Sequence, residues 1–261
     1  MRISLAQFAS DADPAENLHV VEQAADAAAQ AGSRLLVLPE ATMRRFGLPL
    51  REIAEPVDGP WADRVRAIAR ERALTVVVGM FTPAPDGRVH NTLLVTGPGV
   101  DTHYDKIHLY DAFGFTESRT VAAGADPVVF DVDGVRVGLA TCYDIRFAGL
   151  FQALADRGAA LIAVSASWAA GPGKVEQWEL LARARALDST SYVAACGQPA
   201  PSGRSPENRD PTGIGHSLVA APDGTVVGGL DAAPGMLTVD VDPTRVDAVR
   251  RTLPVLANRR W

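Results

Sequence analysis

The chain has 261 residues, of which 47% are hydrophobic and 21% are charged, and its formal net charge at pH 7 is −6. A chain of this length buries about 70–75% of its unfolded surface, so its core needs no disulfide staples. The acidic balance argues against a nucleic-acid surface, and acidic residues interrupt every apolar stretch well before the roughly 18 residues of a membrane-spanning helix.

The predicted elements alternate between strands and helices. Helical spacing of apolar residues predicts helices, and short apolar runs between turn residues predict strands. The first half predicts a strand over 3–9, a helix from Asp13 to Gly32, a strand over 35–38, a helix over 61–73, and strands over 74–80, 91–96 and 102–105. The second half predicts strands over 128–132 and 135–140, a helix over 148–155, a strand over 160–164, a helix over 175–187, strands over 192–196, 215–220, 226–227 and 236–241, and a helix over 243–251. No linker divides the chain, so we predict one α/β domain over residues 1–261, with two sheets between helix layers.

The chain carries two cysteines, Cys142 and Cys196. Two cysteines cannot build a disulfide framework, and the first residues lack the long apolar run of a signal peptide. We therefore expect a reducing, cytoplasmic location. Cys196 ends a predicted strand without a flanking motif, so we interpret it as an inert packing residue.

Cys142 lies where the predicted strand 135–140 gives way to the predicted helix 148–155. Free backbone N–H groups at such a junction carry partial positive charge and favour an anion. An ordinary thiol, with a pKa of about 8.5, is only a few per cent thiolate at neutral pH. We therefore expect this position to raise the thiolate fraction of Cys142, and an inert buried thiol is the alternative.

Two other groups occupy similar positions in the sequence. Glu40 comes directly after the apolar run 35–38, and Lys106 follows the predicted strand 102–105. In open α/β folds, reactive groups gather at the carboxyl ends of strands. A carboxylate, an ammonium group and a thiol that meet there can supply a base, an oxyanion stabiliser and a nucleophile. Taken singly, each of these residues is more simply a solvated or packed side chain.

Three segments resemble the catalytic motifs of the nitrilase superfamily of carbon–nitrogen hydrolases: Leu38-Pro39-Glu40, Tyr104-Asp105-Lys106-Ile107-His108-Leu109 and Thr141-Cys142-Tyr143-Asp144-Ile145-Arg146-Phe147. Their order and spacing also fit, and the segments 115–118, 177–186 and 215–217 recur in that family. The resemblance therefore covers almost the whole chain. The most similar branch is that of the omega-amidases and deaminated-glutathione amidases.

The resemblance implies a four-layer αββα sandwich that dimerises through its helices. It also implies that Cys142 attacks an amide or nitrile carbon and forms a thioester, while Glu40 transfers the protons. Lys106 and the Tyr143 backbone N–H would hold the oxyanion, and Glu117 would orient Lys106 or the substrate. No metal or organic cofactor enters such a reaction. The apolar tail residues 253–256 favour the same homodimeric state.

The predicted substrate is a small amide that carries a carboxylate and releases ammonia. Arg146 follows Cys142 by four residues, and an arginine at this place contacts the substrate carboxylate in the similar carbamoyl amino acid hydrolases. The alternative is that Arg146 pairs with Asp144 or another acidic residue and only stiffens the turn. Trp168 is interpreted either as a pocket wall or as core filling. Residues 148–149 depart from the family pattern, and the loop between Lys106 and Glu117 is short, which bears on the substrate more than on the mechanism.

Other functions stay open at this point. A nitrilase or an N-carbamoyl-amide hydrolase could use the same Glu40, Lys106 and Cys142, and a non-catalytic relative could bind a metabolite. A papain-like pair would join Cys142 to His108 or His216. The histidines lack metal-ligand spacing. The segment 171–174, Gly-Pro-Gly-Lys, resembles a phosphate-binding loop only superficially, because Val follows where Ser or Thr is needed.

Overall fold

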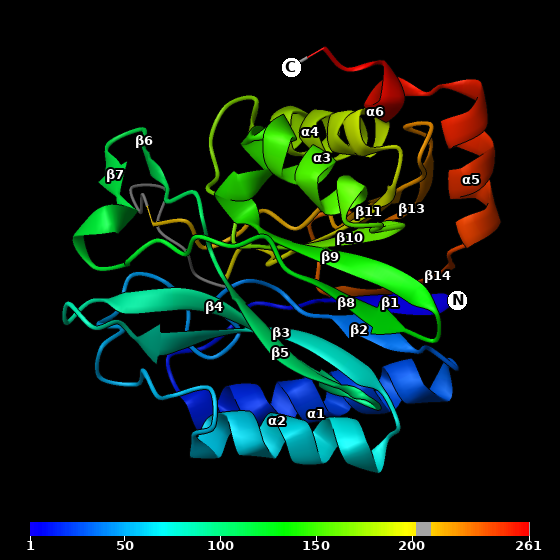
Figure 1. Ribbon diagram of the computed structural model, residues 1–261. Coiled ribbons are helices and arrows are strands. Elements are labelled where there is room, and N and C mark those ends of the chain that lie inside the picture. Colours follow the sequence, from blue (N-terminus) through cyan, green and yellow to red (C-terminus); the bar gives the residue numbers. More distant parts are fainter. Residues whose placement is uncertain (202–209, 261) are drawn as a thin grey trace.

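The computed structural model describes residues 1–201 and 210–260. Two six-stranded sheets lie face to face between two pairs of helices, which gives four layers in the order αββα (Figure 1). The outer helices are α1 (Pro14–Gln30) and α2 (Pro60–Glu71) on one side and α3 (Ala148–Asp156) and α4 (Lys174–Ser189) on the other. The predicted four-layer α/β sandwich is confirmed.

The first sheet combines a parallel centre with antiparallel flanks. Its strands, in spatial order, are β14 (Gly235–Asp240), β1 (Arg2–Gln7), β2 (Leu35–Val37), β3 (Thr75–Pro83), β4 (Val89–Gly97) and β5 (Val100–Asp105). Strands β1, β2 and β3 run parallel, and the remaining pairs are antiparallel. The centre is buried on both faces, which explains why β2 is a continuous apolar run.

The second sheet follows the same plan. Its strands, in spatial order, are β13 (Val226–Gly229), β12 (Leu218–Ala220), β11 (Tyr192–Gly197), β10 (Leu161–Ala166), β9 (Val135–Thr141) and β8 (Val129–Val132). Here β9, β10 and β11 run parallel. The smaller elements are the hairpin β6 (Asp111–Ala112) and β7 (Phe115–Thr116), the 3₁₀ turns η1 (Glu117–Arg119) and η2 (Cys142–Arg146), and the helices α5 (Pro243–Thr252) and α6 (Val255–Asn258).

Three hydrophobic layers hold the sandwich together. The middle layer lies between the two sheets and contains residues of both, such as Leu5, Tyr104 and Cys196. One outer layer joins the first sheet to α1 and α2 and includes Trp61. The other joins the second sheet to α3 and α4 and includes Trp178. Burying each large apolar side chain stabilises the fold by about 1.5–3 kcal/mol. The middle layer joins the two sheets, so it also fixes how their strand ends face each other.

The structure differs from the sequence predictions at three places. Residues Cys142–Arg146 form a 3₁₀ turn that the sequence did not predict, and the α-helix that follows begins at Ala148 as predicted. The short loop expected between Lys106 and Glu117 contains the small hairpin β6–β7. The strand predicted from residue 215 begins at Leu218, because His216 has a left-handed φ of 57° that no strand accommodates. In the ranges 1–201 and 210–260, no helix is long and apolar enough to cross a membrane.

Candidate active site

Glu40 follows β2 and is held by contacts from both sheets. Its side chain is 1% exposed, and its Oε2 accepts a 2.7 Å hydrogen bond from the backbone N–H of Ser167, which follows β10. Its backbone carbonyl accepts a 2.7 Å hydrogen bond from Nε2 of Gln198. Gly79 on β3 lies so close to this loop that a Cβ there would come within 2.6 Å of the Ala41 nitrogen. Glycine at 79 therefore lets the chain turn and direct Glu40 into the space between the sheets.

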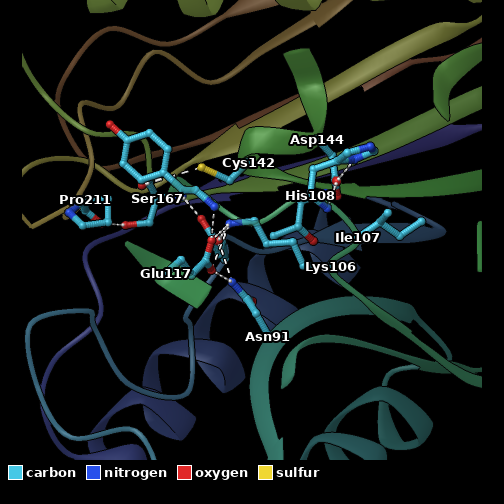
Figure 2. A network of polar contacts seen from close by, with 12 residues as sticks. Asn91, Lys106, Ile107, His108, Glu117, Cys142, Asp144, Ser167 and Pro211 are labelled. Carbon is cyan, nitrogen blue, oxygen red and sulfur yellow. Dashed lines mark hydrogen bonds and ion pairs between the residues drawn. The ribbon is translucent and has the colours of Figure 1, made fainter. Parts of the chain in front are cut away.

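Lys106 lies between two carboxylates, as Figure 2 shows. Its Nζ is 3.0 Å from Glu40 Oε1 and 2.9 Å from Glu117 Oε2. Asn91 on β4 donates through Nδ2 to Glu40 Oε1 at 2.7 Å and to Glu117 Oε1 at 3.2 Å. Glu117 also accepts a 2.6 Å hydrogen bond from the Tyr110 backbone N–H. The three ionisable groups are thus fixed at hydrogen-bond distance, each 3% exposed or less.

Cys142 begins the 3₁₀ turn η2 with a φ of 47°. This left-handed conformation is uncommon for a residue with a Cβ, and such outliers persist only where the surroundings hold them. Its Sγ lies 3.9 Å from the Ser167 carbonyl oxygen. Cys142 lines one small cavity together with Glu40, Lys106 and Glu117. The structure therefore brings together the four residues that the sequence motifs nominated.

Asp144 anchors the turn that carries Cys142. Its Oδ2 accepts hydrogen bonds from the Thr141 backbone N–H at 2.8 Å and from the Tyr104 hydroxyl at 2.6 Å. Its Oδ1 accepts one from the His108 backbone N–H at 3.0 Å and lies 2.7 Å from His108 Nδ1. Asp144 is fully buried, and within the described ranges its ion pair is with His108 and not with Arg146. The predicted alternative of an Asp144–Arg146 pair is therefore wrong.

Burial and neighbouring charges shift the pKa values of the three central groups. Burial, and then the nearby Glu40 carboxylate, raise the pKa of the Cys142 thiol well above its ordinary value. Burial also raises the pKa of Glu40, although Lys106 opposes it. Burial alone would lower the pKa of Lys106, but the Glu117 and Glu40 carboxylates outweigh it and raise it. The expectation that position 142 favours a thiolate is thus wrong, because desolvation and the Glu40 carboxylate outweigh the positive charge of Lys106.

A second small cavity lies on the other side of Cys142. It is lined by Tyr143, Arg146, Trp168 and Lys174, and it shares Ser167 and others with the first. About 10 Å³ of each cavity is open to the centre of a water molecule, and the empty space around it, which includes open solvent, measures about 240 Å³ in the second cavity and about 200 Å³ in the first. Cys142 thus has a carboxylate-rich cavity on one side and a cation-lined cavity on the other.

Arg146 and Trp168 form one wall of the second cavity. Arg146 donates from Nη2 to Gln177 Oε1 at 2.8 Å, and its Cζ lies 5.0 Å from the centroid of the Trp168 ring. Its Nε is buried and has no hydrogen-bond partner among the residues that the structure describes. Trp168 is 4% exposed and also packs in the outer layer beside Trp178. Trp168 is therefore both core filling and pocket wall.

The histidines occupy positions that do not suit a cysteine–histidine pair. His108 is bound to Asp144 and stacks on Phe147, with ring centroids 3.7 Å apart. His216 lies 3.6 Å from a carboxylate oxygen of Glu179. Across residues 1–201 and 210–260, neither histidine is hydrogen-bonded to Cys142, and no three His, Cys, Asp or Glu side chains are grouped to hold a metal ion. Glu40 is the basic group beside the thiol.

Sequence reasoning missed several residues of this site. Asn91, Ser167 and Gln198 all hold carboxylate or backbone groups of Glu40, yet each comes from a different strand or strand end. Lys174 was noted only as part of a failed phosphate-loop pattern, although it lines the cavity beside Cys142. The positions of these four residues depend on pairing between distant segments, so no local pattern indicates them.

Comparisons with known proteins agree with this geometry. The family model described as "Carbon-nitrogen hydrolase" matches residues 2–251. A Mycobacterium tuberculosis protein named as a hydrolase is 60% identical over 99% of this chain and 95% of its own length. The deaminated glutathione amidase of Escherichia coli O157:H7 is 34% identical over 100% of this chain and 98% of its own length.

One solved structure bears on the cysteine. A mutant of the amidase from Nesterenkonia sp. AN1 superposes with a TM-score of 0.83 at 27% identity, covering 100% of this chain and 94% of its own. That structure shows covalent addition of the acetamide moiety of fluoroacetamide at the active-site cysteine of that amidase.

Proposed function

The chain belongs to the carbon–nitrogen hydrolase family and is an amidohydrolase for bonds other than peptide bonds, and on that premise we propose that its substrate is a small carboxylate-bearing amide. We propose that the reaction releases ammonia through a thioester on Cys142. One observation carries the proposal. A buried lysine is held between two carboxylates beside a buried thiol. This arrangement supplies a nucleophile, a base and a fixed positive charge at one point.

In the first step, Glu40 takes the proton of the Cys142 thiol as Sγ attacks the amide carbon. The raised pKa values of both groups fit such a transfer, because a more basic carboxylate is a better acceptor for the proton of a thiol that stays neutral at rest. The carbonyl oxygen becomes an oxyanion. Lys106 Nζ and the Tyr143 backbone N–H stabilise it in the proposed mechanism, and Glu117 holds Lys106 in place.

In the second step, Glu40 gives its proton to the amide nitrogen, the carbon–nitrogen bond breaks, and ammonia leaves. The acyl group then remains on Sγ as a thioester. Glu40 next removes a proton from water, which attacks the thioester carbon. The carbon–sulfur bond breaks, the thiol regains its proton, and the carboxylic acid product leaves. Arg146 binds the substrate carboxylate at the opposite end of the pocket, since its planar fork suits two carboxylate oxygens.

A panel of matched substrates tests this function. We expect ammonia release from amides with a carboxylate at the far end, such as succinamate, and little from nitriles or ureido acids of the same length. A preference for the nitrile or the ureido acid would assign the alternative chemistry to the same residues. Binding without turnover of any member would instead support a metabolite-binding relative.

We also propose that the protein is at least a homodimer, with the helices after Cys142 and the C-terminal tail at the interface. Leu180 and Leu187 on α4 are 66% and 40% exposed, and Leu253 at the end of α5 is 43% exposed. Exposed leucines on these elements favour a buried contact with a second copy of the chain. Trp261 of the predicted tail lies outside the described residues. Light scattering at micromolar concentration tests the proposal, and a stable monomer would overturn it.

A further inference from the structure

The cavity beside Cys142 carries more positive charge than the proposed reaction needs. Arg146 and Lys174 both line it. Among the described residues, no carboxylate lies within ion-pair distance of either cation, whereas Lys106 on the other side of Cys142 has two. Two cations without counterions in one small cavity favour an anionic ligand there.

Lys174 is an unusual residue in this chain. The sequence contains only two lysines, Lys106 and Lys174, and every other basic side chain apart from histidine is arginine. Both lysines line cavities that include Cys142. Lys174 is 8% exposed, so it is not one of the solvated surface charges. It is the first residue of α4, after Gly173, whose φ of 69° allows the chain to turn into the helix.

Two aromatic rings lie near the Lys174 ammonium group. Its Nζ lies 3.7 Å from the centroid of the Phe113 ring and 5.8 Å from that of Trp168. The Lys174 carbonyl oxygen accepts a 3.0 Å hydrogen bond from Trp168 Nε1. Contacts of a cation with ring faces are weaker than charge-assisted hydrogen bonds to an anion, so a ligand carboxylate can replace them.

The charges on the two sides of Cys142 orient a substrate. Glu40 and Glu117 outnumber Lys106 on one side, which repels an anion, while Arg146 and Lys174 attract it on the other. A single carboxylate balances one of these cations and leaves the second without a counterion. Building on the proposed amidase function, we propose that Arg146 and Lys174 together bind two carboxylates on the acyl part of the substrate. The preferred substrate class is then the monoamide of a tricarboxylic acid.

Three amides on the same carbon chain test this subsite. Butyramide has no carboxylate, glutaramate has one at the far end, and 3-carboxyglutaramate has two. Isothermal titration of the Cys142→Ala variant measures their binding without turnover. We expect the dissociation constant to fall at least about tenfold with each added carboxylate, because each forms charge-assisted hydrogen bonds to a cation in a largely enclosed cavity.

Variants separate Lys174 from a general effect of net charge. Lys174→Met keeps the length of the side chain and removes its charge, and Lys174→Arg keeps the charge. We expect Lys174→Met to weaken binding of 3-carboxyglutaramate at least about tenfold while butyramide binding changes less than about twofold, and Lys174→Arg to retain most of the affinity. Arg251→Met, which removes one exposed charge on α5, is the matched control and should change none of the three.

Chemical modification of Lys174 provides a readout that does not depend on hydrolysis. We expect 3-carboxyglutaramate to protect Lys174 from reductive methylation, measured by mass spectrometry, and butyramide to leave it reactive. The subsite is overturned if 3-carboxyglutaramate binds no tighter than glutaramate, or if Lys174→Met weakens all three amides equally. Ammonia release from glutaramate without a preference for the second carboxylate would leave the amidase intact and overturn the subsite. If the three amides bind with the expected order of affinities but the unmodified enzyme releases ammonia from none of them, the subsite stands and the amidase function is overturned.

Discussion

Cys142 follows β9 and Cys196 lies near the end of β11, two strands of the same sheet, yet their surroundings differ. Cys196 is fully buried between the two sheets, and its thiol donates to the Ala6 carbonyl oxygen at 3.4 Å. Cys142 is 7% exposed at the end of β9 and shares a cavity with Glu40 and Lys106. Burial raises the pKa of both thiols. Burial alone therefore does not distinguish a reactive cysteine from an inert one.

The distinguishing feature is a base within reach and a path for a ligand. Glu40 lies beside Cys142, and the cavity there continues past the thiol toward Arg146. Cys196 has the Ala6 carbonyl oxygen and the Ser217 hydroxyl as polar neighbours, and it packs among apolar side chains of the middle layer. A thiol that stays protonated at rest can still react if its proton is removed during the attack, so the neighbouring base matters more than the resting thiolate fraction.

The largest predicted difference comes from replacing each cysteine by alanine. Cys142→Ala should lower kcat at least about 10³-fold, because it removes the proposed nucleophile. Cys196→Ala should leave kcat within about twofold and lower stability by about 1 kcal/mol through the small cavity left in the core. Ammonia release and thermal unfolding of both variants measure the two effects. Equal loss of activity in the two variants would contradict the assigned roles.

The next prediction concerns the groups that Cys142 has and Cys196 lacks. Glu40→Gln and Lys106→Met should each lower kcat at least about 10²-fold, the usual scale for an acid–base group or an oxyanion donor. Because the two groups act on the same step, the double variant should lose far less than the product of the single losses. Multiplicative losses would indicate two independent sites. Circular dichroism checks that removing the buried ion pair has not unfolded the protein.

Sequence reasoning located the proposed nucleophile, Cys142, but not the contacts that fix its position. The apolar run 35–38 and the segment 135–140 predicted strands correctly, since β2 and β9 occupy most of these ranges. The ends of these strands indicated Glu40 and Cys142, because a charged or reactive residue directly after a buried strand stands out locally. The end of the predicted strand 102–105 indicated Lys106 in the same way, and the resemblance then supplied Glu117.

The rest of the site depends on contacts that no local pattern reveals. The left-handed turn at Cys142 is held by Asp144, whose partners include Tyr104 from the first sheet. The pKa of Cys142 depends on burial between segments far apart in the sequence, so a local argument from free N–H groups gave the wrong direction. Lys174 reaches the cavity through the turn at Gly173, which resembled a different motif.

The pH dependence of the reaction tests whether Glu40 activates Cys142. Glu40 must be ionised to accept a proton, and burial raises its pKa above its ordinary value. The acid limb of kcat/KM should therefore lie at higher pH than for an ordinary glutamate, and activity should fall as pH drops through that limb.

Alkylation compares the two thiols directly. Iodoacetamide should alkylate Cys142 in step with activity loss and at least about tenfold faster than Cys196. Preferential labelling of Cys196 with full activity retained would contradict the proposal that Cys142 is the nucleophile.

The smallest predicted effect lies at the far end of the pocket, where Cys142 and Arg146 line the same cavity. If Arg146 binds the substrate carboxylate, Arg146→Lys should raise KM for succinamate about fivefold, since lysine keeps the charge but loses the two-pronged contact. Butyramide has the same chain length without the carboxylate, and its KM should stay within about twofold. Arg251→Lys on the exposed side of α5 is the matched control and should change neither value.

The outcome also tests the structural reading of Arg146. Its guanidinium is hydrogen-bonded to Gln177 and stacked near Trp168, so a purely structural arginine would loosen the pocket wall for every substrate. Equal increases of KM for succinamate and butyramide would therefore assign Arg146 to the scaffold. A selective increase of KM for succinamate, together with loss of the preference for succinamate over butyramide in Arg146→Met, requires a direct contact between Arg146 and the carboxylate. The neutral amide contacts the same pocket wall, but it has no charge that interacts with Arg146.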